Sequence, residues 1–217
     1  MTSLKQQTPI KAGPPPSELR VLTVGHSTRS IEDFLRILRG HGVTCLVDVR
    51  TIPRSRRNPQ FGTESLAASL RQAGIEYVHM PALGGLRHSK ADSINRGWRN
   101  ASFRGYADYM QTPAFDQALE ELVELARRKQ LAVMCAEAVP WRCHRSLIAD
   151  ALLARGVGVE HMMSETDRRP HQLTPFAKID GARVTYPAEE TPELIREEPG
   201  PGPRAGRLAP RRRPKAG

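Results

Sequence analysis

The chain has 217 residues and a mass of 24.1 kDa, which suits one domain with terminal extensions better than two domains. Hydrophobic residues make up 39% of it, enough for a core, but no run approaches the roughly 18 consecutive apolar residues of a membrane span. The first twenty residues hold no apolar stretch, so no secretory signal is expected, and three cysteines without an export signal favour reduced thiols in the cytoplasm.

The positive charge is unevenly distributed. The formal net charge is +10 and the sequence pI is about 10.1. Residues 200–217 contain five arginines, one lysine and no acid, so they supply six of the ten charges. This segment is rich in proline and glycine and is expected to stay disordered. A solvated tail and a nucleic-acid-binding arm are the two interpretations, and either would raise non-specific affinity for phosphate.

Apolar runs alternate with helical patterns along the chain. Strands are expected at residues 20–25, 44–49, 75–80, 131–135 and 157–162. Helices are expected at about 31–39, 63–73, 113–126 and 143–155, with a short one at 103–110, and Ser30 and Thr63 as caps of the first two. This alternation predicts an α/β protein whose mostly parallel five-stranded sheet has helices on both faces.

The expected domain organisation follows from these elements. Residues 1–19 form a leader and residues 20–163 a single α/β domain. Residues 164–190 form a C-terminal extension to which no domain is assigned, and residues 191–217 form the basic tail. Both the leader and the tail are expected to be disordered because they are rich in proline or arginine and poor in apolar residues.

Polar side chains follow several of the predicted strands. Because ligands of open parallel sheets bind outside the carboxyl ends of the strands, these segments are expected to converge on one site. The catalytic candidates are His26, Asp48, Cys135, Glu137, Cys143 and His144. The candidates for binding a substrate or anion at the same strand ends are Ser27, Arg50, Gly84, Gly85, Arg87 and Arg145.

Each acid–base candidate also has a purely structural explanation. Asp48 beside arginines stays ionised, which suits a binding, orienting or base role but also a helix cap or a scaffold pair with Arg50. His26 follows a glycine at a strand end and is either active or a buried histidine with satisfied hydrogen bonds. Cys45 lies within a strand between apolar neighbours and is expected to fill the core.

The two later cysteines have different surroundings. Cys135 closes the apolar run LAVM and suits the core, although the loop after it is placed to bring a ligand over it. Cys143 is expected near a helix start, where free N–H groups and the charges of Arg142, His144 and Arg145 favour both a thiolate and a bound anion. The spacing from Cys135 to Arg142 is one residue longer than the Cys-x5-Arg loop of phosphatases and sulfurtransferases, so a phosphatase is not predicted.

A metal centre is an alternative use of the same side chains. Cys135, Glu137, Cys143 and His144, with His26 as a further ligand, are the side-chain types that bind transition metals. The spacing Cys-x7-Cys-His matches no recognised zinc motif. We therefore predict no cofactor, and a divalent metal remains the alternative.

Two loops near the expected site are rich in arginine. The first contains Arg54, Ser55 and Arg56, with Phe61 behind them, and the second contains Trp98 among its basic residues. The second loop is too long for an ordinary connection, which is typical of a functional segment. Such loops are often only solvated surface, but arginines beside an aromatic ring suit an anionic or nucleotide-like ligand.

Five segments of the chain resemble one protein family. They are TVGHSTRSIEDFLRIL, LVDVRTIPRSRRNPQF, YVHMPALGGLR, YADYMQTPAF and CAEAVPWRCHRSLIADALLARG. Their order and spacing, from about residue 20 to residue 161, are similar to those of the bacterial and archaeal family called domain of unknown function 488. The resemblance implies a small α/β domain and no settled reaction. The family pattern falls on His26, Ser27, Asp48, Arg50, Pro53, Ser55, Phe61, Gly84, Gly85, Arg87, Cys135, Glu137, Cys143, His144 and Arg145.

Three functions compete. The first is an enzyme acting on an anionic substrate, such as a phosphate-bearing small molecule, a nucleotide or a nucleic acid. Its roles would fall to Arg50, Arg87 and Arg145 for the anion, Cys135 or Cys143 as nucleophile, and His26 or Glu137 for proton transfer. The second is a non-enzymatic nucleic-acid-binding or regulatory module, and the third is a metal-binding protein. No membrane partner is expected, and the oligomeric state is not predicted.

Overall fold

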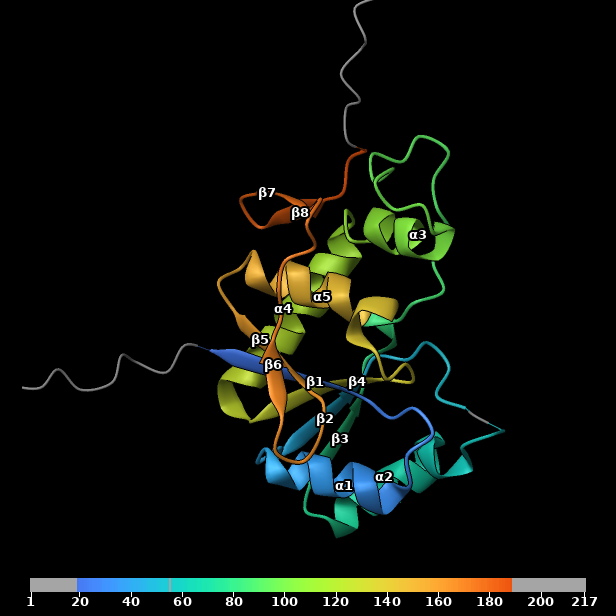
Figure 1. The fold of residues 1–217 in the computed structure, drawn as a ribbon, viewed down its shortest axis with the longest axis vertical. Coiled ribbons are helices and arrows are strands. Elements are labelled where there is room, and N and C mark those ends of the chain that lie inside the picture. Colours follow the sequence, from blue (N-terminus) through green and yellow to red (C-terminus); the bar gives the residue numbers. More distant parts are fainter. Residues whose placement is uncertain (1–18, 55, 189–217) are drawn as a thin grey trace, which may run out of the picture.

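The computed structural model describes residues 19–54 and 56–188, in which a six-stranded sheet lies between layers of helices (Figure 1). The strand order is β3-β2-β4-β1-β5-β6. Five strands pair in parallel, namely β1 (Arg20–Gly25), β2 (Cys45–Asp48), β3 (Glu76–His79), β4 (Leu131–Cys135) and β5 (Gly158–Met162). The α/β class and the mostly parallel sheet are therefore confirmed.

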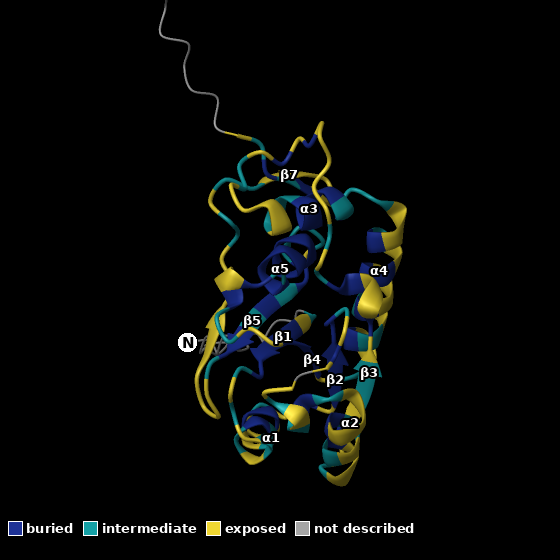
Figure 2. Cartoon of the chain, turned by 90° about the vertical axis from the view of Figure 1, so that its right-hand side faces the viewer, coloured by how far each residue is buried: buried dark blue, intermediate teal, exposed yellow. Residues whose placement is uncertain are grey.

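Helices cover both faces of the sheet. On one face lie α1 (Ile31–Gly40) and α2 (Thr63–Gln72), and on the other lie α4 (Pro113–Arg128) and α5 (Arg145–Leu153), with α3 (Ala101–Tyr109) beyond them (Figure 1). Figure 2 shows the buried residues concentrated in the strands and on the inner sides of the helices. The neighbours Val21 and Leu22 of β1 belong to opposite core clusters, because successive side chains of a strand point to opposite faces.

The helix caps only partly follow the sequence. Ser30 caps α1 as predicted, since its Oγ accepts a hydrogen bond from the Asp33 backbone N–H at 3.1 Å. The prediction that Thr63 caps α2 is wrong: the cap is Gly62, and Thr63 is the first residue of the helix. The reason is the short 3₁₀ turn η1 (Pro59–Phe61), which ends directly before Gly62, so that the helix begins one residue earlier than expected. The Thr63 hydroxyl instead donates to the Pro53 carbonyl at 3.3 Å.

The predicted number of five strands is wrong, because the segment after residue 163 contributes further pairing. Strand β6 (Arg168–Pro170) pairs antiparallel with β5, and β7 (Lys178–Asp180) and β8 (Arg183–Thr185) form a separate two-stranded ribbon. These strands have three residues each and no run of apolar residues, so the sequence carries no strand signal for them. Tyr186, which follows β8, is fully buried and donates a hydrogen bond to Asp150 on α5 at 2.8 Å.

Two further 3₁₀ turns, η2 (Pro81–Leu83) and η3 (Pro140–Arg142), lie in the loops after β3 and β4. Among the residues described, every helix is too short or too polar to cross a lipid bilayer. The predicted disorder of the leader and of the basic tail falls outside the described residues, apart from Leu19.

Candidate functional site

A cavity of about 650 Å³ opens beside the carboxyl ends of β1, β2 and β4. Its walls come from the loops that follow these strands, from the loop after η2 and from the side chains of α3. The buried part of the wall consists of His26, Arg50, Tyr106, Cys135 and Cys143. The exposed part, at the mouth, consists of Thr28, Ile52, Arg54, Arg57, Leu86, Ser102, Ala136, Glu137 and Arg142.

Two thiols and an imidazole meet on the buried wall. The sulfur atoms of Cys135 and Cys143 and a ring nitrogen of His144 all lie within 4.8 Å of one another. The His144 Nδ1 is 3.7 Å from the Cys143 sulfur. The hydrogen bond from the Cys135 thiol, together with His144 and the Arg145 charge, holds the pKa of Cys143 well below its usual range. Burial would raise this pKa, but its effect is smaller than that of the Cys135 hydrogen bond. The same hydrogen bond, followed by burial, raises the pKa of the Cys135 thiol.

Arg145 places a buried positive charge behind the thiols. Its side chain is 1% exposed, and its Nη1 donates to the Thr23 hydroxyl at 3.2 Å. Its Nη2 donates to the Glu137 carbonyl, and its Nε has no partner. Among the described residues no carboxylate pairs with this guanidinium. Because a buried charge without a counter-charge is costly, a thiolate at Cys143 is stabilised here.

A second buried group fixes the position of His26. The Arg50 guanidinium forms an ion pair with Asp48, with Nη2 and Oδ2 2.6 Å apart, and also donates to the Phe61 carbonyl at 2.9 Å. The Tyr77 hydroxyl donates to the same Asp48 oxygen at 2.9 Å. The remaining Arg50 Nη1 lies 3.3 Å from His26 Nε2. Asp48 thus acts on the cavity through Arg50 and is itself fully buried.

His26 is neutral and both of its nitrogens have partners. Burial lowers its pKa from 6.5 to about 4. The Arg50 guanidinium only donates, so Nε2 of His26 accepts, and Nδ1 donates to the Ser27 carbonyl at 2.8 Å. The ring stacks on Phe61 with centroids 4.2 Å apart. Ser27 has φ of 51°, a left-handed conformation that non-glycine residues adopt only when their surroundings hold them there.

Close backbone approaches shape the cavity. A Cβ atom on Gly25 would lie 1.9 Å from the Glu137 carbonyl oxygen, so only glycine lets the loop after β4 cross the end of β1. A Cβ atom on Gly85 would lie 3.2 Å from His144 Nδ1. The next residue, Leu86, has φ of 59° and a side chain that is 77% exposed at the mouth.

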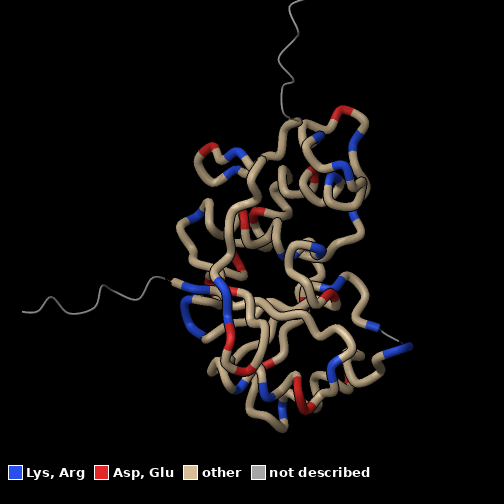
Figure 3. The backbone as a smooth tube through the Cα atoms, viewed as in Figure 1, with Lys and Arg blue, Asp and Glu red and all other residues tan. Residues whose placement is uncertain are grey.

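The mouth of the cavity is positively charged. Arg54, Arg57 and Arg142 are exposed there, and Glu137 is the single acidic residue among the described lining residues. Figure 3 shows the loop after β2 projecting from the body of the protein with several basic residues along it. The cavity therefore combines a lining that is mostly apolar in area with a cationic opening, which suits a ligand with an apolar or aromatic body and an anionic group.

The thiols and His144 could also hold a metal. Two thiolates and one imidazole are ligands that zinc and other thiophilic metals prefer. Glu137 is not part of this group, because it lies at the mouth, where its Oε1 accepts a hydrogen bond from the Val139 N–H at 3.3 Å.

Comparison with protein-family models gives a match to the family described as Domain of unknown function DUF488, over residues 30–152, which is more than half of the chain. The chain belongs to this family. No curated protein and no solved structure matches it. The resemblance that the sequence motifs predicted is therefore confirmed.

In this DUF488 protein, many of the predicted site residues line the cavity. They are His26, Ser27, Arg50, Arg54, Gly85, Cys135, Glu137, Cys143 and His144. Three others, Asp48, Phe61 and Arg145, lie behind the wall and contact residues that line it. Ser55 falls outside the described residues.

The remaining predicted residues do not line the cavity of this DUF488 protein. Arg87 donates to the carbonyls of Gly84 and Ala82 and lies 3.7 Å from the centroid of the Tyr109 ring. Gly84 is buried against Thr51, and Arg56 is exposed elsewhere on its loop. Trp98 packs against Phe103 with ring centroids 4.7 Å apart. Helix α5 begins at Arg145, so Cys143 lies two residues before the helix.

Sequence reasoning missed the contribution of α3 and of several loop residues. The missed lining residues are Thr28, Thr51, Ile52, Leu86, Ser102, Phe103, Tyr106, Ala136 and Ala138. Tyr106 had a signal, because it lies in one of the five DUF488-like segments, YADYMQTPAF. Its ring lies against His144 with centroids 5.0 Å apart, and its hydroxyl donates to the Leu83 carbonyl at 2.9 Å.

Proposed function

We propose that this DUF488 protein is an enzyme that acts on a phosphate-bearing substrate, with Cys143 as the nucleophile. The observation that carries the proposal is the placement of the Cys143 sulfur on a cavity wall beside the Cys135 thiol, His144 Nδ1 and the unpaired charge of Arg145. A thiolate with an imidazole neighbour and an opening to a ligand-sized cavity is the arrangement that nucleophilic cysteine catalysis requires.

The surrounding residues then take distinct roles. Cys135 donates a hydrogen bond that stabilises the thiolate, and Arg145 supplies its counter-charge. His144 is the proton-transfer group, because its Nδ1 faces Cys143 and its Nε2 has no partner. His26 is a positioning residue in this proposal, because both of its nitrogens are already engaged.

The substrate enters with its phosphate at the mouth. The arginines that bind it are the exposed ones, Arg54, Arg57 and Arg142, because Arg50 and Arg145 are buried and already have partners. The buried part of the cavity receives the rest of the substrate, and the electrophilic centre of the substrate lies at the Cys143 sulfur. A nucleotide has both parts and is the substrate class that we favour.

The test is alkylation of the full chain with iodoacetamide, followed by mass spectrometry of the cysteine peptides. Cys143 should be labelled well before Cys45, which is buried in the core, and thymidine monophosphate should protect it. The Arg142→Gln variant should need more nucleotide for the same protection. If Cys143 is labelled no faster than Cys45, Cys143 is not the nucleophile. If no phosphate-bearing ligand protects Cys143 from labelling, the proposed substrate class is wrong.

The exposed Arg127, on the outer side of α4, offers the matched control. The Arg127→Gln variant removes one positive charge, as Arg142→Gln does, but far from the cavity. It should leave the protection of Cys143 unchanged. Equal weakening in both variants would mean that the general charge of the protein binds the nucleotide.

A thiophilic metal centre is the second candidate, favoured by the cluster of Cys135, Cys143 and His144. Addition of Co²⁺ to the reduced protein should then produce thiolate-to-metal charge-transfer absorption, and Cys143→Ser should abolish it. Cys45→Ser is the control, because this buried cysteine lies outside the cluster. A protein that shows no such absorption would exclude this candidate and leave the first one standing.

A further inference from the structure

A second cavity lies next to the first one. Its volume is about 590 Å³, and it is formed by η3, the start of α5, strands β5 and β6, and the segment 171–176. Neighbouring residues line the two cavities at two places. In η3, Arg142 lines the first cavity and its neighbour Trp141 lines the second. In the loop and helix before α4, Phe103 lines the first and Trp98, in ring contact with it, lines the second.

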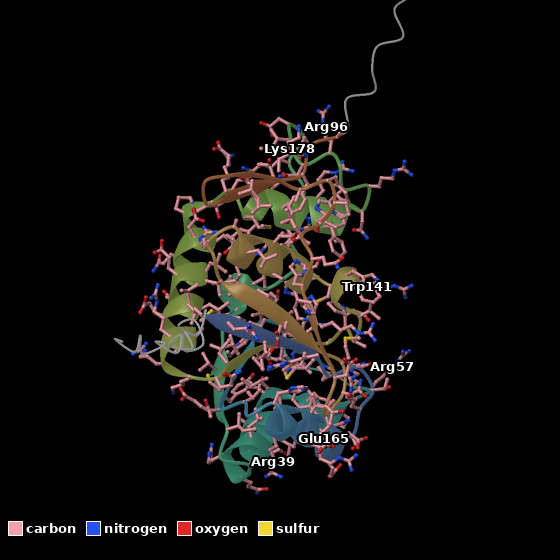
Figure 4. All side chains as sticks on the ribbon, turned by 60° about the vertical axis from the view of Figure 1, so that its left-hand side comes forward. Arg39, Arg57, Arg96, Trp141, Glu165 and Lys178 are labelled. Carbon is pink, nitrogen blue, oxygen red and sulfur yellow. The ribbon has the colours of Figure 1, made fainter. Side chains whose placement is uncertain are left out.

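The walls of the second cavity are largely aromatic. Trp98, Trp141 and Phe176 line it, and the Trp98 and Phe176 rings meet edge to face with centroids 4.9 Å apart. Trp141 is 66% exposed, which is unusual for the largest apolar side chain. Figure 4 shows Trp141 and Arg57 on the same side of the molecule. Such rings offer a flat face on which a planar ligand can stack.

The two histidines of this cavity have partners within the protein, whereas the buried Trp98 Nε1 has no hydrogen-bond partner among the described residues. His161 contacts the Thr23 hydroxyl through Nδ1 at 2.7 Å and His171 through Nε2 at 3.0 Å. The other nitrogen of His171 lies 2.8 Å from the Asp150 carboxylate. Neither histidine therefore offers a nitrogen to the edge of a ligand. The aromatic walls suit stacking, which every nucleobase can satisfy, and the exposed Arg169 lies at the edge in an ion pair with Asp167.

We propose that the second cavity binds an unpaired base of a single-stranded nucleic acid whose neighbouring nucleotide occupies the first cavity. This proposal rests on the proposed function, because it takes the first cavity to hold a phosphate-bearing substrate. An extended strand that crosses η3 meets Arg142 and then Trp141, so a phosphate lies on the guanidinium and the next base stacks on the indole. The substrate nucleotide is then part of a polynucleotide strand.

The chain carries its own reporter for this binding. It contains two tryptophans, Trp98 and Trp141, and both line the second cavity. A base stacked there should quench the intrinsic fluorescence, whereas a ligand confined to the first cavity should not. The experiment is a fluorescence titration of the full chain with a single-stranded thymidine oligonucleotide, with the same sequence in a duplex, and with thymidine monophosphate.

The single strand should quench tryptophan emission, and the duplex and the monophosphate should not. Trp141→Leu should weaken oligonucleotide binding, followed by anisotropy of a labelled strand, by about tenfold or more. Arg127→Gln, remote from both cavities, should bind as the wild type does. The surface position of Trp141 means that its replacement does not threaten the core.

Three results would overturn the proposal. The first is oligonucleotide binding without quenching, which would assign binding to the basic residues 200–217 or to the first cavity alone. The second is equal quenching by monophosphate or duplex, and the third is quenching by a proline-rich peptide but not by the oligonucleotide. Protection of Cys143 by the monophosphate tests ligand binding in the first cavity alone. A failure of the proposed function can therefore be told apart from a failure of the second-cavity proposal.

Discussion

Acidification should destabilise this protein through two buried histidines. Burial lowers the pKa of His26 to about 4 and that of His161 to about 3, whereas both have a value of 6.5 in an exposed chain. The folded state therefore stays deprotonated at these sites while the unfolded state takes up protons. The stability that the two neutral histidines contribute is fully present above pH 6.5. It is lost as the pH falls toward the pKa values of the folded state. When the pH is lowered from about 7.5 to about 5.5, each histidine reduces the free energy of unfolding by about 1.4 kcal/mol, and the two together reduce it by about 3 kcal/mol.

The structure explains why His161 resists protonation. Arg145 donates to Thr23, whose hydroxyl then donates to His161, and the chain of hydrogen bonds continues through His171 to Asp150. When both histidines are neutral, the guanidinium, which only donates, and the ionised carboxylate, which only accepts, fix the direction of every bond between them. A proton added to His161 would break one of these bonds inside the protein.

The assay is urea denaturation at the two pH values, with the midpoint and slope followed by circular dichroism. His26→Gln and His161→Gln should each lower stability at neutral pH but remove about half of the pH dependence, and the double variant should remove nearly all of it. A wild-type stability that is equal at both pH values, or a double variant that keeps the full dependence, would refute the assignment of two neutral buried histidines.

Further substitutions test the parts that position the site. Asp48→Asn leaves the buried Arg50 charge without its carboxylate and should cost about 3–5 kcal/mol in the free energy of unfolding, measured by urea denaturation. Gly25→Ala forces the loop at Glu137 to move and should cost about 1–3 kcal/mol, with faster proteolysis of that loop. Gly158→Ala, in the neighbouring strand, meets nothing closer than 3.6 Å and should remain within about 1 kcal/mol of the wild type, so an equal cost in both glycine variants would contradict the crowding argument.

The sequence was informative about the fold where the signal is local. Strands β2 and β4 are buried, mostly apolar runs, and the stripe of α1, with Phe34, Ile37 and Leu38 buried, follows from helical spacing. Strand β6 and the ribbon of β7 and β8 could not be predicted in this way. Their residues are mostly exposed, and β6 exists because β5 presents an edge to which it pairs.

The chemistry of the site was harder to predict than its location. The strand ends identified many of the residues that line the cavity, but the sequence does not tell which arginines are buried and which are exposed. Arg145 was expected to bind an anion, but its side chain is buried and donates a hydrogen bond to Thr23. Thr23 lies 122 residues away in the chain, so the sequence does not reveal this contact. Arg142, next to the cysteine, faces the mouth instead. Tyr106 was not recognised because its contact with His144 depends on the packing of α3.

The central claim is that Cys143 is a thiolate on the wall of the cavity. The most direct measurement is the ultraviolet absorbance of thiolate as a function of pH, taken as the difference between the reduced wild type and Cys143→Ser. A single thiolate should already be present at a pH well below the ordinary thiol pKa in the wild type and be missing in the variant. A difference that develops only near the ordinary thiol value of about 8.5 would contradict the account.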